Sequence, residues 1–166
     1  MIGIDKAEFD AIFDSWYDAL RNFIYYKCGD VQVAEDIAQD TFLKLWEKRH
    51  QIKRETVKPL LFKIAYNLFI NRVQHQKVSF RFAEAAKVEK MHESADFNLE
   101  MSEFDAKLQR ALASLDERNR TVFLMNRVEE FTYAQIAETL GLSVKAVEKR
   151  MEKALSYLRL AIDKNI

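Results

Sequence analysis

The sequence is poor in the residues that form tight turns and cross-links. It has three glycines, one proline and one cysteine among 166 residues. Strands joined by tight turns need glycine or proline, so this scarcity disfavours a β-rich fold, and the abundance of Leu, Ala, Lys and Glu favours helices. We therefore predict an all-α protein. Cys28 has no second cysteine to pair with, and we expect a passive, partly buried thiol.

Long apolar runs and an excess of one charge are also missing. The run LLFKIAYNLFI is too short and too polar to span a bilayer. The first residues, MIGIDKAEFDAIF, lack the basic segment followed by an apolar block that marks a secretory signal. From both observations we expect a cytoplasmic protein.

The formal net charge is zero, but charge is distributed unevenly along the chain. Residues 5–47 carry ten acidic and four basic side chains, whereas residues 48–77 carry eight basic side chains and the single acid Glu55. The first block suits a protein partner and the second suits phosphates.

A third block, residues 84–105, has seven acids, two lysines and few large apolar residues. We interpret it as part of a linker, although a solvated helix fits the local pattern equally well. We predict two small helical domains at residues 5–77 and 105–162, joined by a flexible acidic linker at residues 78–104. Each half would bury about 60% of its unfolded surface, which is enough for a modest core.

The first unit contains an apolar helix followed by a mixed one. Gly29 is predicted to end the first helix. Apolar residues recur along this helix at helical spacing: Phe9, Ile12, Phe13, Trp16, Leu20, Phe23 and Ile24. Asp30 then caps a helix whose predicted inward residues are Ala34, Ile37, Ala38, Phe42 and Leu45. Its other side combines acidic with apolar groups, at Asp36, Asp40, Leu43 and Glu47. This mixture indicates a binding face, and an ordinary solvated surface is the alternative.

The third helix of this unit begins near Pro59 and carries an unusual polar face. Its predicted buried residues are Leu61, Ile64, Ala65, Leu68 and Val73. The polar face consists of Lys63, Asn67, Asn71 and Gln74, with Tyr66, Arg72 and Lys77 beside it. Asparagine is a mediocre helix former, so amides next to basic and aromatic groups favour contacts with base edges, stacked bases and phosphates. An ordinary polar surface remains the alternative.

Residues 131–159 have the pattern of a helix-turn-helix. Ala137 lets the two helices touch, Gly141 makes the turn and Val147 anchors the second helix. Thr132 with Gln135, and Ser143, are N-terminal caps. The second helix directs Val147, Met151, Leu155 and Leu158 inward and Lys145, Glu148, Lys149 and Lys153 outward. That outer face can enter a major groove, and a helical packing module without DNA is the alternative.

Three stretches together resemble one family. These stretches are AEDIAQDTFLKLWEK, KPLLFKIAYNLFINRVQHQK and ALASLDERNRTVFLMNRVEEFTYAQIAETLGLSVKAVEKRMEKALSYLR. In this order they are similar to the polymerase-binding, promoter-melting and helix-turn-helix regions of bacterial sigma-70 family sigma factors of the extracytoplasmic-function group. The resemblance implies a sigma factor that binds core RNA polymerase, recognises promoter DNA and aids strand opening.

The resemblance also implies which residues do this. Contacts with core polymerase are expected at Asp36, Gln39, Asp40, Phe42 and Leu43. Minus-ten recognition and melting are expected at Lys63, Tyr66, Asn67, Asn71 and Arg72. Minus-thirty-five contacts are expected at Ser143, Lys145, Lys149, Arg150 and Lys153. The partners would be core polymerase, promoter DNA as duplex and as single strand, and a membrane-linked anti-sigma factor, with no small-molecule substrate, cofactor or metal.

The sequence departs from the family at several positions. The family often has Trp at Leu60, Pro at Asp116, an acid at Gln135 and Thr at Ala146. These differences leave open which residue supports the single-strand pocket and which base contacts form near Ala146.

Three other classes of protein compete with this interpretation. A ligand-sensing helix-turn-helix repressor would need a pocket domain, whereas the N-terminal helices of this chain are already accounted for by a small core and an amide face. An enzyme would need a convergent constellation, yet His50, His75 and His92 lack metal-like spacing and no nucleophile motif is present, so we expect no catalytic activity. A protein-binding bundle is disfavoured by the basic block at residues 48–77.

Overall fold

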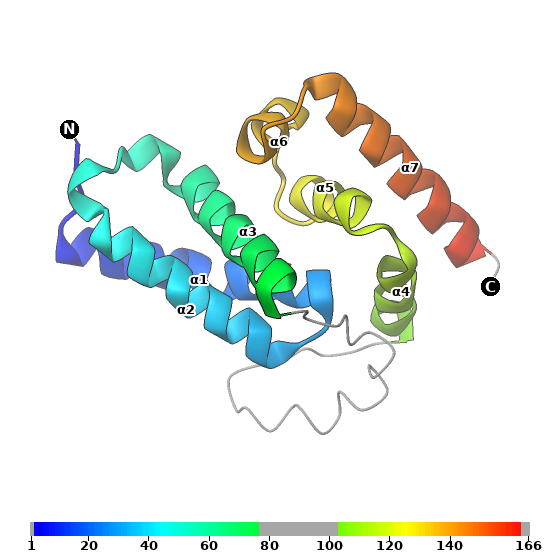
Figure 1. Ribbon diagram of the computed structural model, residues 1–166, viewed down its shortest axis with the longest axis horizontal. Coiled ribbons are helices and arrows are strands. Elements are labelled where there is room, and N and C mark those ends of the chain that lie inside the picture. Colours follow the sequence, from blue (N-terminus) through cyan, green and yellow to red (C-terminus); the bar gives the residue numbers. More distant parts are fainter. Residues whose placement is uncertain (1, 77–102, 164–166) are drawn as a thin grey trace.

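The structure, a computed structural model, describes residues 2–76 and 103–163 (Figure 1). Its elements are α1 (Lys6–Cys28), α2 (Val31–Glu47), the 3-10 helices η1 (Arg49–Gln51) and η2 (Arg54–Thr56), α3 (Val57–Gln76), α4 (Glu103–Ser114), α5 (Glu117–Arg127), α6 (Tyr133–Leu140) and α7 (Val144–Asp163). The described residues form helices and no β-strand, so the prediction of an all-α fold is confirmed. The predicted linker at 78–104 lies almost wholly outside the described residues.

The ends of the helices follow the capping residues in the sequence. Gly29 adopts φ 73°, and its N–H donates to the carbonyl of Tyr25 at the end of α1. The Asp30 carboxylate accepts the N–H groups of Gln32 and Val33 and begins α2. Because only two residues separate the helices, α1 and α2 pack against each other over their length. Both predicted caps are confirmed.

The first unit packs α1, α2 and α3 around a shared apolar core. All five residues of α2 that were predicted to face inward are buried. The predicted stripe of α1 is buried only in its second half, from Leu20 onward, and Phe13 is 37% exposed. The sequence pattern also missed two side chains of α3, Phe62 and Phe69, which are fully buried.

The second unit contains α4 to α7, and its helix-turn-helix forms as predicted. Thr132 and Gln135 make a reciprocal capping box at the start of α6. Gly141 adopts φ 69° between α6 and α7, where a Cβ atom would meet nothing within 4 Å. The left-handed backbone, rather than crowding, therefore favours glycine there. Ser143 Oγ accepts the N–H of Ala146 and caps α7.

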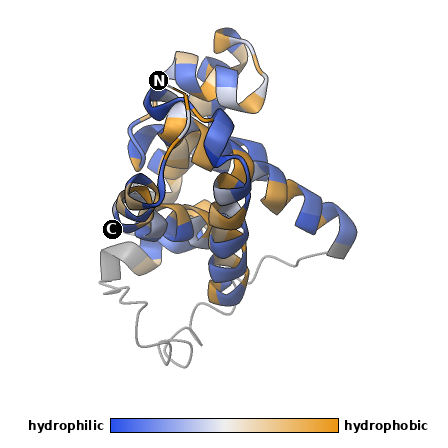
Figure 2. Ribbon diagram, turned by 90° about the vertical axis from the view of Figure 1, so that its left-hand side faces the viewer, coloured by the Kyte–Doolittle hydropathy of each residue, from blue (hydrophilic) through white to orange (hydrophobic). Residues whose placement is uncertain are grey.

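The two units pack against each other. Contacts join α1 to α4 and α5, and α3 to α6 (Figure 1). The Phe62 and Phe131 rings meet edge to face, with centroids 5.2 Å apart, so the two predicted cores are in contact. Figure 2 shows hydrophobic and hydrophilic residues alternating along the helices, as expected for amphipathic helices packed on one side.

Arg120 of α5 is the most extensively hydrogen-bonded charged side chain at this junction. It is 3% exposed, and its guanidinium donates to four carbonyl oxygens, those of Leu112, Ala113, Leu115 and Lys27. Three of these carbonyls belong to the end of α4 and the turn after it, and the fourth belongs to α1. Arg120 therefore holds the start of the second unit together and attaches it to the first.

Candidate functional site

The polar face of α3 is exposed where its amides lie. Asn67 and Asn71 are one helical turn apart, and both side chains are exposed, as is Lys63. Each amide offers two donors and an acceptor, so neighbouring amides can hold the edge of an unpaired base. The structure therefore places three of the five predicted minus-ten residues on an accessible face.

The other two residues of that set, Tyr66 and Arg72, are half-buried. Burial and the nearby Glu117 carboxylate raise the pKa of Tyr66, so its hydroxyl stays neutral and can act as a hydrogen-bond donor. Arg72 lies 3.4 Å from the Asp36 carboxylate through both terminal nitrogens. This distance is long for an ion pair, so Arg72 can exchange Asp36 for a phosphate at little cost.

A second candidate surface lies on α2. Gln39, Asp40 and Leu43 are exposed, and Leu43 is 60% exposed although it is apolar. Asp36 is half-buried beside Arg72, and Phe42 is 3% exposed because its ring packs against the Phe13 ring, with centroids 4.9 Å apart. The structure therefore places Phe42 within the core, beneath the surface that Leu43 presents.

An apolar groove adjoins Leu43. Its volume is about 360 Å³, and it is lined by Phe9, Phe13, Gln39, Phe42, Leu43 and Trp46. Sequence reasoning did not assign Phe13 or Trp46 to this surface. The available signal was the aromatic stripe of α1, whose Phe13 is 37% exposed. A groove with apolar walls and an acidic border suits an amphipathic helix that carries basic residues.

The third candidate surface is the outer side of α7. Ser143, Lys145, Lys149 and Lys153 are exposed, and Arg150 is half-buried. The hydroxyl of Ser143 is engaged in the cap of α7, so its oxygen already accepts one hydrogen bond. Lys149 and Lys153 are one turn apart, which suits successive phosphates or base edges along a groove.

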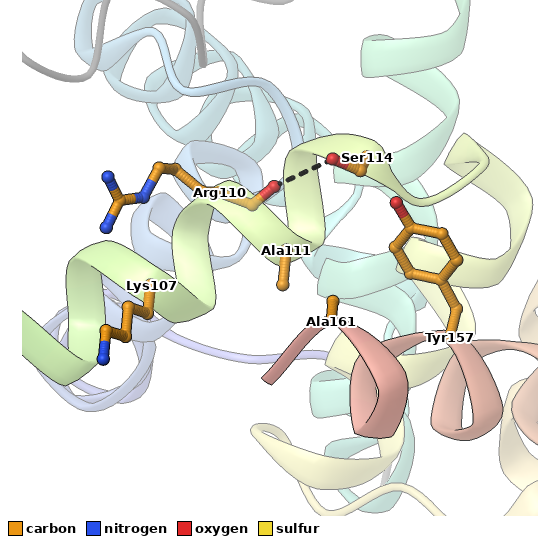
Figure 3. A pocket seen from close by; sticks show the side chains of 6 residues that line it. All are labelled: Lys107, Arg110, Ala111, Ser114, Tyr157 and Ala161. Atoms are coloured by element: carbon orange, nitrogen blue, oxygen red, sulfur yellow. Dashed lines mark hydrogen bonds between the residues drawn. The ribbon is translucent and has the colours of Figure 1, made fainter. Parts of the chain in front are cut away.

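A cleft lies between α4 and α7. It measures about 450 Å³ and is lined by Lys107, Arg110, Ala111, Ser114, Tyr157 and Ala161. In Figure 3 the side chains of Lys107 and Arg110 point away from Tyr157, and Ser114 Oγ donates to the carbonyl of Arg110. The two basic side chains of this cleft are therefore directed away from the Tyr157 ring.

Residues 2–76 and 103–163 contain neither a metal-binding cluster nor a membrane-spanning helix. Within these ranges no three His, Cys, Asp or Glu side chains gather where they could hold a metal. None of the helices described has the length and apolar character to cross a membrane.

The single cysteine lies in the core. Cys28 is fully buried, and burial raises the pKa of its thiol to about 11. The thiolate is therefore scarce at neutral pH, which agrees with the expectation of a passive thiol, but the thiol is fully rather than partly buried.

Comparison with known proteins identifies both units. The model of Sigma-70 region 2 matches residues 12–78, and the model of Sigma-70, region 4 matches residues 105–158. The RNA polymerase sigma factor YlaC of Bacillus subtilis is 25% identical over 160 residues, which cover 93% of this chain and 90% of YlaC. The ECF RNA polymerase sigma factor SigW of the same organism is 28% identical over 170 residues, with 93% and 89% covered.

Solved structures share the fold. CnrH, solved in complex with the cytosolic domain of CnrY, matches with a TM-score of 0.73 and 23% identity, covering 98% of this chain and 92% of CnrH. The sigma factor RpoE of Bartonella quintana, solved with the anti-sigma factor NepR, matches with a TM-score of 0.72 and 20% identity, covering 94% and 97%. The helical architecture described above is therefore found in solved proteins.

Proposed function

Because this chain belongs to the sigma-70 family and is a sigma factor that directs promoter-specific transcription initiation by core RNA polymerase, we propose that its two units divide that task. The first unit, residues 5–77, binds polymerase through α2 and opens the minus-ten element through α3. The second unit, residues 105–162, reads the minus-thirty-five element through α7. The observation that carries this division is the exposed Asn67–Asn71 pair, because it gives the first unit amides that can bind the edge of an unpaired base, on a helix separate from the helix-turn-helix of the second unit.

Transcription in vitro from a promoter that this sigma factor recognises tests the function as a whole. Core polymerase should retain the chain in a pulldown and, with it, start RNA at a defined site. A repressor would bind the promoter without polymerase, and an adaptor would bind polymerase without directing a start site. Either outcome would refute the proposal.

Leu43 is the residue of the α2 surface that is easiest to test. Replacing it by aspartate should weaken binding to core polymerase about 10-fold or more, because an exposed apolar contact becomes a charge buried in the interface. Leu160→Asp is a matched control, since Leu160 is 62% exposed and lies on α7. Binding is measured by competition for core enzyme. Equal losses for the two variants would remove α2 from the proposed interface.

The role of the outer side of α7 can be tested by measuring how the affinity for promoter DNA depends on salt concentration. Removing Lys149 and Lys153 together by alanine should weaken binding to the upstream element and lower the slope of log K against log salt by about 0.9 for each phosphate that is no longer neutralised. A lysine that reads a base would instead cost about 1 to 3 kcal/mol on the cognate site alone. Arg159→Ala is the control, because Arg159 is exposed on the same helix beyond the proposed surface. An unchanged slope would place the duplex surface elsewhere.

We infer further properties from the family. Sigma factors are initiation factors whose chemistry is carried out by the polymerase, so we propose no catalytic activity and no cofactor for this chain. Its place of work is then the cytoplasm, where the polymerase acts. RpoE of Bartonella quintana and CnrH were solved with an anti-sigma factor and with the cytosolic domain of CnrY. Their similarity in fold supports an anti-sigma partner here, which we expect to be membrane-linked.

A further inference from the structure

An apolar patch lies on the outer side of α7, next to the surface proposed to contact duplex DNA. Tyr157 is 42% exposed and Leu160 is 62% exposed, and they are three positions apart, so both face the same side of the helix. They border a groove of about 490 Å³, whose other lining residues are Lys149, Glu152, Lys153 and Ser156. Large apolar side chains exposed side by side mark an interaction site.

Basic side chains lie on both sides of this patch. Tyr157 also lines the cleft between α4 and α7, where Lys107 and Arg110 point away from its ring (Figure 3). Among the described residues that line the cleft and the groove, Glu152 is the single acid. The outer side of α7 therefore has the features of an amphipathic helix that binds an apolar groove with an acidic border.

The groove at Leu43 has such a border. On α1, Asp10 lies three positions before Phe13, and on α2, Asp40 and Glu47 lie three positions before and four after Leu43. All three carboxylates are exposed and share a helix face with the exposed apolar residue. They belong to the acidic N-terminal block of the sequence, which carries ten acidic and four basic side chains. The border of the groove is therefore complementary in charge to the lysines of α7.

The two surfaces cannot meet within one chain. The groove is formed by α1 and α2, whereas α7 packs on α4, α5 and α6, and Figure 1 shows it on the opposite side of the molecule from α2. The patch and the groove can therefore pair only between two copies. The formal net charge of the chain is zero, so two copies have no overall charge repulsion to overcome.

We propose that the groove at Leu43 binds the α7 patch of a second copy of this chain, so that copies associate head to tail. Tyr157 and Leu160 enter the groove, and the lysines of α7 lie against its acidic border. Because the two surfaces differ, each dimer keeps one free surface of each kind, to which further copies can add. In the assembly, the proposed polymerase surface of one copy and the proposed DNA surface of its neighbour cover each other. The association stands on these surfaces alone, and only this consequence rests on the proposed function.

Sedimentation velocity of the full-length chain, without polymerase or DNA, tests the association. Over a range of about 1 to 200 μM we expect the average mass to rise above that of a single chain, as for a small and transient interface. Raising the salt concentration from about 0.1 to 0.5 M should weaken the association several-fold, because salt screens exposed charges. A chain that stays monomeric over this range, or whose association is insensitive to salt, would overturn the proposal.

Two single variants distinguish head-to-tail pairing from other arrangements. Leu43→Asp removes the groove and Tyr157→Asp removes the patch, and each variant alone should associate about 10-fold or more weakly than the wild type. Mixed in equal amounts, the two should form a dimer and nothing larger, because each keeps the surface that the other lacks. Val128→Asp is the matched control, since Val128 is 48% exposed at the end of α5, and it should associate like the wild type.

A self-complementary contact would give a different result. If the groove paired with the groove, or the patch with the patch, one of the two variants would still associate alone and the mixture would form no mixed dimer. Either observation would refute head-to-tail pairing, provided that circular dichroism shows the helices intact. Competition for core enzyme is measured at nanomolar concentrations, where the copies are apart, so Leu160→Asp remains a control for polymerase binding. Transcription by the wild type, on which the proposed function depends, is unaffected by any of these outcomes.

Discussion

Replacing Asn67 and Asn71 together by alanine is expected to leave polymerase binding intact and to slow promoter opening about 10- to 100-fold. Opening a duplex exposes bases that were stacked and paired, and extruding one costs a few kcal/mol. The exposed amides of α3 can offset part of this free energy by forming hydrogen bonds to the edge of the extruded base. Both side chains are exposed, so the fold loses little with them.

Permanganate reactivity of unpaired thymines measures the effect directly. Asn22→Ala is a suitable control, because Asn22 is also an asparagine within a helix but lies on α1, outside the proposed surfaces. A template with a premelted bubble should largely restore the double variant, since the extrusion energy no longer has to be supplied. If the variant opens duplex promoter as fast as wild type, the melting role of α3 is refuted.

Substitution of Arg120 by methionine should be the most destabilising single change at a charged residue of these helices. Methionine keeps the length of the side chain but donates no hydrogen bonds, so the carbonyls of Lys27, Leu112, Ala113 and Leu115 lose a buried partner. An unpaired buried acceptor costs about 1 to 3 kcal/mol. Relaxation of the structure and entry of water should provide new partners for some of the four carbonyl groups. We expect the free energy of unfolding to fall by about 3 kcal/mol or more, and the melting temperature by roughly 10 °C.

Urea and thermal unfolding measure this loss. Arg118→Met is the matched control, because Arg118 is exposed on the same helix and its substitution should change the free energy of unfolding by less than about 0.5 kcal/mol. Similar losses for both variants would show that the guanidinium of Arg120 contributes no more than a surface charge.

The sequence predicted what is local to a helix or its ends. Asp30, Gly29 and Ser143 act within four residues of their own position, and the inward residues of α2 follow the helical period. The exposure of Asn67 and Asn71 follows from the same period, because they lie opposite the buried stripe of α3.

What the sequence could not predict lies between the units. The ammonium of the buried Lys27 donates to Glu117, which is 90 positions away in the sequence. A periodicity argument within either helix assigns such charged residues to solvent. Phe62 and Phe69 were missed for the same reason, since they extend the buried face of α3 beyond the stripe that a single neighbour would need. Tyr66 was assigned to DNA on the pattern of α3, and the structure adds a contact with the Lys27 ammonium that only the folded chain reveals.

The exposure of Gln39, Asp40 and Leu43 while the two units are in contact has a kinetic consequence. Polymerase can bind this face without a prior rearrangement of the chain, because these three side chains are already accessible. Association through α2 is then a second-order encounter. Its observed rate should therefore rise in proportion to the polymerase concentration.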